Sequence, residues 1–145
     1  MQSLRAVVGV ILAFVAMSVL VLALSLAPWF VLGVDAVLEP GHFESTSLFN
    51  VYAVAVGGLG AVFGGWICAA VGRSRTAVIV LAVLCFLAGM LNHFSQHHKP
   101  EPGARLAGVS VMDAVTQRKE PDWFTLLMPL LGGAGVLVGG RGAGR

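Results

Sequence analysis

The stretch of sequence that decides the fold runs from Leu48 to Val71: LFNVYAVAVGGLGAVFGGWICAAV. It contains no charged residue or histidine, and it exceeds the ~20 apolar residues that a helix needs to cross ~30 Å of hydrocarbon. Small residues recur in it every four positions and share one helix face: Ala53, Gly57, Ala61, Gly65 and Ala69, with Gly60 and Gly64 beside them. Membrane helices associate through close backbone packing, which small residues at this spacing permit. The stretch therefore predicts a membrane-spanning helix with a helix-packing face.

Three more uncharged stretches lie before and after residues 48–71, at about 6–30, 76–91 and 123–140. The GRSR sequence at 72–75 is short enough to join the two middle stretches, 48–71 and 76–91, as a tight helical hairpin. Pro28 is expected to end or kink the first span, and Pro129 to kink the last, because proline removes a backbone hydrogen bond. The sequence thus predicts a single all-α domain over residues 1–145, an integral membrane four-helix bundle.

The composition excludes an ordinary soluble domain. Hydrophobic residues make up 57% of the chain and charged residues 11%, whereas soluble domains have about 45–50% and about 25%. The formal net charge of +2 is too small and too dispersed for the clustered basic surface of a nucleic-acid-binding protein. The lipid bilayer is the expected partner, and nucleic acid is not.

The basic residues predict the orientation. The loop at 35–47 has acids but no Lys or Arg, and the longer loop at 92–122 offsets its bases with acids. The positive-inside rule therefore predicts that both loops lie outside the cytoplasm. It places both chain termini in the cytoplasm, together with five arginines: Arg5, Arg73, Arg75, Arg141 and Arg145. The opposing evidence is Arg118 and Lys119, close to the last span. The expected anchors at the membrane interfaces are Trp29, Trp66, Trp123, Arg73 and Arg75.

The second outer loop has its own pattern. Four apolar residues follow a spacing of three: Leu106, Val109, Met112 and Val115. Ser110 with Asp113 resembles a capping box, and Pro121 would stop a helix before the last span. We expect a short amphipathic helix on the outer membrane surface or over the bundle, with an irregular loop as the alternative.

The last predicted span carries a second small-residue strip, formed by Gly132, Gly135 and Gly139. The segments 57–66 and 132–141 share the pattern GGxGxxxGG, which raises the hypothesis of a duplicated two-helix unit. Packing inside one bundle is the preferred interpretation of both strips, and dimerisation is the alternative.

Catalytic chemistry has little support in this sequence. An acid, base or histidine inside a membrane span usually marks function, and the four predicted spans contain none. Cys68 and Cys85 are best explained as small packing residues. His93 and His97 are four residues apart and could hold a metal with His42 as a third ligand, but a polar cluster at the interface is the preferred interpretation. We therefore predict no enzyme, no bound metal and no cofactor.

Three weak motifs carry a resemblance over most of the chain. They are the GGW sequence at 64–66, the aromatic pair Trp123 and Phe124, and the P-x-x-G-x-x-G run of Pro129, Gly132 and Gly135. On these motifs the chain resembles a loose class of small, uncharacterised bacterial four-helix multi-pass membrane proteins. The resemblance implies the cytoplasmic (inner) membrane of a bacterium, and it implies no activity.

Two functions follow as expectations from this sequence. The first is a structural or accessory subunit that packs against a larger membrane complex, with another membrane protein or a second copy of the chain as its partner. The second is a small transporter or channel, in which the glycines and the Pro129 kink would surround a pathway.

Overall fold

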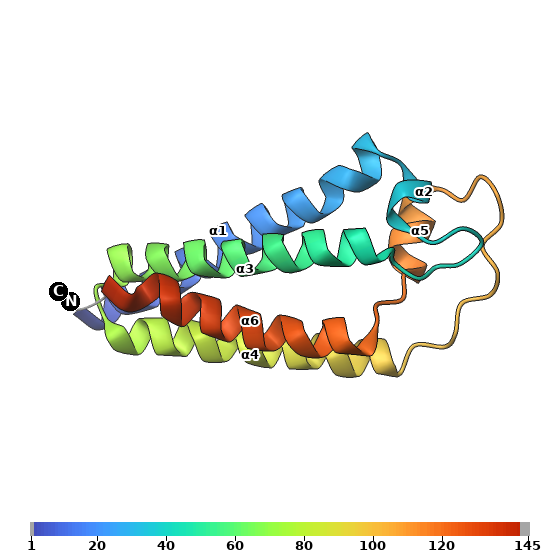
Figure 1. Cartoon of the computed structure of the whole chain (residues 1–145). Coiled ribbons are helices and arrows are strands. Elements are labelled where there is room, and N and C mark those ends of the chain that lie inside the picture. Colours follow the sequence, from blue (N-terminus) through green and yellow to red (C-terminus); the bar gives the residue numbers. More distant parts are fainter. Residues whose placement is uncertain (1, 143–145) are drawn as a thin grey trace.

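The computed structural model describes residues 2–142, and Arg145, counted above among the cytoplasmic arginines, lies outside this range. The described chain is helical and contains no strand (Figure 1). Its elements in order are α1 (Gln2–Val31), α2 (Val34–Val37), α3 (Ser47–Gly72), α4 (Arg75–His97), α5 (Val111–Gln117), α6 (Asp122–Gly139) and the 3₁₀ turn η1 (Gly140–Gly142).

Four of these helices, α1, α3, α4 and α6, are long and apolar enough to cross a membrane, as the hydropathy of the sequence predicts. Two details differ from the expectation. Pro28 does not end α1, because the helix continues to Val31 and the backbone N–H of Leu32 donates to the Pro28 carbonyl oxygen at 2.9 Å. The third predicted span ends at 91, but α4 continues to His97, since the polar residues 92–97 include no helix breaker before Pro100.

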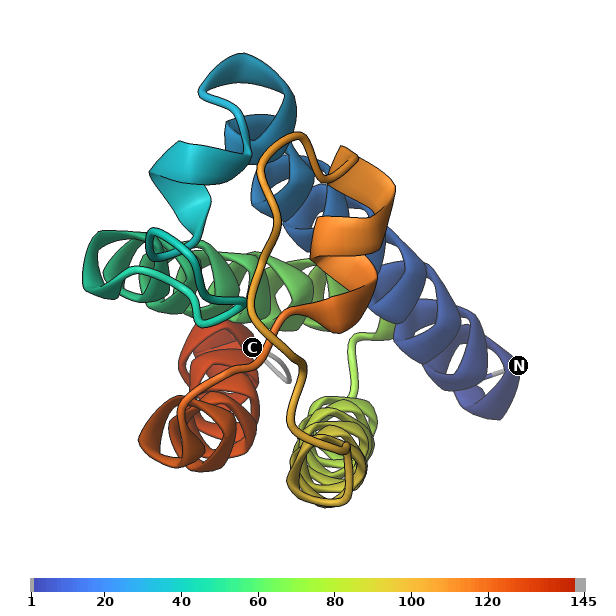
Figure 2. The same ribbon diagram turned by 90° about the vertical axis from the view of Figure 1, so that its right-hand side faces the viewer.

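The helix α3 occupies the centre of the arrangement. It packs against α1 on one side and α6 on the other, and α4 packs mainly against α6 (Figure 2). Buried side chains from all four long helices form one apolar cluster: Ala13, Ala61, Cys68, Ala77, Val78, Leu81, Ala82 and Val136. The members are small, so the helix backbones approach one another closely.

The turn between α3 and α4 lies at one end of the bundle. Arg73 ends α3 in a left-handed conformation with φ 45°, and its backbone N–H donates to the Ala69 carbonyl oxygen at 3.1 Å. The Ser74 hydroxyl then caps α4 by accepting from the Ala77 N–H at 3.4 Å. We call this end of the molecule the arginine end, because four described arginines lie there: Arg5, Arg73, Arg75 and Arg141.

The two long loops fold together at the opposite end, and we call this unit the cap: α2, residues 38–46, and residues 98–121 with α5 (Figure 1). Backbone hydrogen bonds tie the loops to each other. The Lys119 N–H donates to the Phe43 carbonyl oxygen at 2.9 Å, and the Arg105 N–H donates to the Gly41 carbonyl oxygen at 2.9 Å. The cap closes over a second apolar cluster, which it shares with the helix ends: Trp29, Val37, Leu38, Phe43, Phe49, Ala53, Ala114 and Phe124.

Candidate functional site

The closest helix contact joins α3 and α6 through glycines of both predicted strips. Gly65 lies directly against the backbone carbonyl group of Val136, and Gly139 lies directly against the carbonyl oxygen of Val62. On the cap side of these two contacts, a Cβ added at Gly135 would come within 2.7 Å of the Ala61 Cβ. The two helices therefore touch at backbone distance, and only glycine leaves room for this contact.

The helix α3 presents other glycines to α1 and to the outer part of α6. Gly60 lies against Val21, and Gly64 lies against Met17, whose Cβ would be 3.1 Å from an added methyl group. Gly57 faces the side chain of Met128 on α6. The remaining members of the strips lie in other surroundings. Ala53 is buried in the apolar cluster under the cap, Ala69 packs against the apolar cluster of the four long helices, and Gly132 lies near Cys85.

Two further close approaches were missed by the sequence analysis. A Cβ at Gly9 would lie 2.7 Å from the Gly72 Cα, and a Cβ at Gly89 would lie 2.9 Å from the Pro129 Cα. The first contact joins α1 to the end of α3, and the second joins α4 to α6. Each involves an isolated glycine without the spacing of four that marks a strip, so the sequence offered no periodic signal for them.

The predicted interface tryptophans occupy different surroundings. Trp66 and Trp123 are 59% and 52% exposed. Trp29 is instead only 2% exposed, and its ring meets the Phe49 ring edge to face with the ring centroids 5.9 Å apart. The side chain is buried because α2 and the loops of the cap fold over the end of α1.

The cap contains a polar network next to its apolar cluster. The buried Ser45 hydroxyl donates to the Asn50 side-chain oxygen at 2.7 Å. The Arg118 guanidinium forms an ion pair with Glu120 and lies 5.0 Å above the centre of the Phe49 ring. Burial lowers the pKa of Arg118 to about 10. Arg118, which opposed the predicted orientation as a free charge near a span, thus lies inside the folded cap.

A polar cleft of about 290 Å³ opens beside this network, between the first loop and the start of α6. Its charged lining is mainly acidic and comes from Glu39, Glu44, Lys119, Glu120 and Asp122. Lys119 forms an ion pair with Glu101 of the long loop. This hydrogen bond raises the pKa of Lys119 and lowers the pKa of the Glu101 carboxyl group. The cleft presents carboxylates and one paired ammonium group to solvent.

The histidines lie where α4 meets the cap end of α6. The Nδ1 atom of His93 is hydrogen-bonded to the hydroxyl of Thr125 at 2.8 Å, and the rings of His93 and His97 stack at 6.3 Å. Within residues 2–142, no three His, Cys, Asp or Glu side chains gather in a way that could hold a metal ion. The His93 ring therefore serves as a polar link between α4 and α6, and both cysteines are free thiols.

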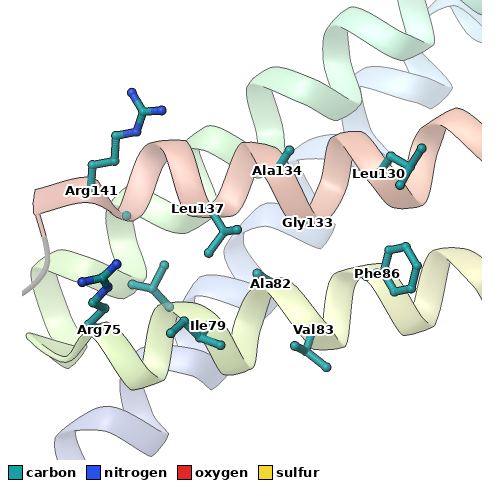
Figure 3. Close-up of a pocket in the computed structure, with 12 residues that line it drawn as sticks. Arg75, Ile79, Ala82, Val83, Phe86, Leu130, Gly133, Ala134, Leu137 and Arg141 are labelled. Carbon is teal, nitrogen blue, oxygen red and sulfur yellow. The ribbon is translucent and has the colours of Figure 1, made fainter.

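A long groove runs along the outside of α4 and α6, with a volume of about 880 Å³ (Figure 3). Its walls are apolar over most of their length, and Arg75 and Arg141 stand at one end of it. Gly133 and Ala134 line part of its floor and rim. Because these two residues have little or no side chain, they leave a depression in the surface of α6.

In comparisons with known protein families, curated proteins and solved structures, this chain matches none. Its class is therefore defined by the fold alone, as an all-helical protein with four helices able to cross a membrane.

Proposed function

We propose that the chain is an accessory subunit of a larger membrane complex in the cytoplasmic membrane of a bacterium. The four long helices span the bilayer, the arginine end faces the cytoplasm, and the cap faces the periplasm. The clustering of Arg5, Arg73, Arg75 and Arg141 at one end supports this orientation. The burial of Arg118 against Phe49 weakens the opposing evidence of Arg118 and Lys119, because the first of these two charges is engaged within the cap.

The cap is the observation that carries the proposed role. Its two loops are hydrogen-bonded to each other over an apolar cluster in which Ala114 is fully buried and Phe43 is 5% exposed. Loops that only connect spans do not need such a core. The cap holds the polar cleft and the exposed Met112 in fixed positions above the membrane. A rigid surface of this kind suits recognition of a partner protein's extramembrane part.

The transporter or channel alternative has weaker support. Backbone contact between α3 and α6 at Gly65 and Gly139 leaves no space for a solute between these helices. Among the described residues, the buried polar side chains are Ser45, Asn50 and Thr125, which all lie at the cap end. A pathway through the bundle would need polar groups at greater depth.

Site-specific photo-crosslinking in native membranes tests the accessory role. A photoreactive residue at Met112, 74% exposed on the cap, should crosslink to one protein of constant mass. The same residue at Ile11, 56% exposed on α1, is the matched control for random lipid-phase collisions. The Phe43→Ala variant should lose the Met112 adduct, because its cap is open. Equal adducts from both positions, or none from Met112, would contradict the proposal.

The orientation has its own test. A Met112→Cys variant should react with a membrane-impermeant maleimide in intact cells, whereas an Arg141→Cys variant should react only after the membrane is opened. The unsubstituted chain is the control, since Cys68 is buried and Cys85 half-buried in their helices. The reverse labelling pattern would place the cap in the cytoplasm.

A further inference from the structure

The groove between α4 and α6 combines two features that together describe one ligand. Its apolar walls include Ile79, Val83, Phe86 and Leu137, and its lining contains no acidic side chain. Arg75 and Arg141 are both exposed, and neither forms a salt bridge within the described part of the chain. The groove therefore has two arginines at one end, with Arg75 directed toward α6 and Arg141 directed away from α4, and it offers hydrocarbon contacts along the rest (Figure 3).

The length of the groove fits one membrane leaflet. Along α4 it extends from Arg75 to Phe86, and along α6 from Leu130 to Arg141. At 1.5 Å per residue each wall is roughly 16 Å long. Half of a ~30 Å hydrocarbon core is about 15 Å. A lipid whose phosphate contacts the two arginines would thus lay one acyl chain along the whole groove.

From this match of charge and length we propose that the α4–α6 groove binds an anionic phospholipid. One acyl chain lies along the apolar walls, and the headgroup phosphate contacts Arg75 and Arg141. A guanidinium group suits this role because its planar donors pair with phosphate oxygens in bidentate fashion. At Gly133 the two helices are in ordinary contact, because an added Cβ would lie 3.6 Å from the Ala82 carbonyl oxygen and 3.7 Å from the Phe86 Cβ. The acyl chain therefore lies on the outer side of this contact and not between the helix backbones. The inference rests on the proposed membrane placement of α4 and α6 and not on the accessory role.

The chain supplies a charge-matched control for the two arginines. Arg5 and Arg73 lie at the same end of the molecule and line a separate cavity with Ser3, Ser74 and Thr76. Beyond this cavity an apolar groove of about 270 Å³ continues between α1 and α4, from Ala6 to Ile11 and from Thr76 to Val80. At 1.5 Å per residue its walls are roughly 6–8 Å long, about half the length of the α4–α6 walls. Any effect of overall positive charge should be equal for the two pairs, and an effect of the groove should belong to Arg75 and Arg141 alone.

The experiment measures lipid retention by native mass spectrometry, after purification from nanodiscs of equal phosphatidylglycerol and phosphatidylcholine content. The unsubstituted protein should retain phosphatidylglycerol preferentially. The double variant Arg75→Gln/Arg141→Gln should lower this retention about tenfold or more, as expected from two lost contacts of roughly 1 kcal/mol each. Arg5→Gln/Arg73→Gln should retain it like the unsubstituted protein. Equal losses in both doubles would overturn the proposal.

Two variants that add side-chain volume test whether an acyl chain occupies the groove. Ala134→Leu fills the groove from its rim and should lower retention of both lipids, whereas Ala88→Leu, on an exposed α4 position outside the lining, should not. Release of the bound lipid by millimolar inorganic phosphate would indicate a simple anion site and contradict the proposal. A dimer mass that appears when lipid is removed, and that Ala134→Leu abolishes, would assign the groove to a second copy of the chain instead.

Discussion

The sharpest prediction concerns Gly65 at the centre of the α3–α6 contact. Replacing Gly65 with Ala adds one methyl group, which meets the backbone of Val136 rather than a flexible side chain. The carbonyl carbon of Val136 would lie 2.8 Å from the new Cβ, whereas ordinary contact begins at 3.4 Å. The difference between these two distances is 0.6 Å, and α6 must retreat by more than this because the Val136 carbonyl oxygen lies closer to the added Cβ than the carbonyl carbon does.

The energetic consequence follows from the loss of dispersion contacts. A gap of about 0.5–1 Å forfeits a quarter to a half of each contact energy along the separated surface, and over-packing substitutions commonly cost about 1–3 kcal/mol. We expect Gly65→Ala to lower the free energy of unfolding by about 2–3 kcal/mol, toward the upper end of that range. A carbonyl group fixed in a helix cannot rotate away, which is why the upper end applies.

The assay is equilibrium unfolding of the purified protein in mixed micelles. The loss of helix packing is the quantity that is measured. Gly58→Ala is the control, since it lies on the same helix and an added Cβ there meets nothing within 4 Å. This control should be neutral or gain up to about 1 kcal/mol from helix propensity. The double variant Gly65→Ala/Gly139→Ala should cost less than the sum of its single changes, because the first methyl group already displaces α6. Equal stability of Gly65→Ala and Gly58→Ala would refute the close-contact reasoning.

Three other outcomes follow from the structure. Gly89→Ala should destabilise the α4–α6 contact by about 1–3 kcal/mol, because the added methyl group meets Pro129; unchanged unfolding in micelles would count against this contact. Phe43→Ala should open the cap, at a cost of about 3–5 kcal/mol for a buried aromatic, and make the outer loops sensitive to protease while the long helices stay protected. The Glu101–Lys119 ion pair should persist at neutral pH and be lost as the pH falls through the lowered pKa of Glu101, since protonation removes the negative charge. The amide protection factors of residues 98–104, which compare the exchange rate with the intrinsic rate at the same pH, should fall with this loss, and Glu101→Gln at neutral pH should lower them likewise; protection factors that stay constant with acid would contradict the assignment.

The sequence predicted the long helices well, because uncharged stretches of this length have few other structural solutions. It also placed a serine correctly at the start of a short loop helix: Ser110 caps α5 and accepts from the Asp113 N–H at 3.2 Å. This local prediction succeeded since a capping interaction involves residues only three positions apart. The helix is shorter than the apolar spacing predicted, because Leu106 and Val109 precede this cap and lie outside α5. Whether α5 is amphipathic toward the membrane stays a prediction within the proposed placement.

The features that could not be predicted all depend on which elements are neighbours. Trp29 was expected at a membrane surface, but its burial requires the cap to fold over α1, and that folding depends on hydrogen bonds between loops distant in sequence. Predicting that Gly89 contacts Pro129 requires the knowledge that α4 packs on α6. Predicting the groove with Arg75 and Arg141 requires the same knowledge. Hydropathy and spacing describe one helix at a time and carry no such information.

The separation of the apolar residues into two clusters implies two different responses to temperature and denaturant. In the proposed placement, the cluster around Phe43 is formed in water, and its stability falls on cooling and in urea. The cluster around Ala61 is surrounded by lipid and depends on van der Waals contact, so neither treatment weakens it in the same way. Urea-treated membranes should thus hold a protein whose cap has unfolded while its four long helices stay assembled, and its unfolding should proceed in two stages rather than one.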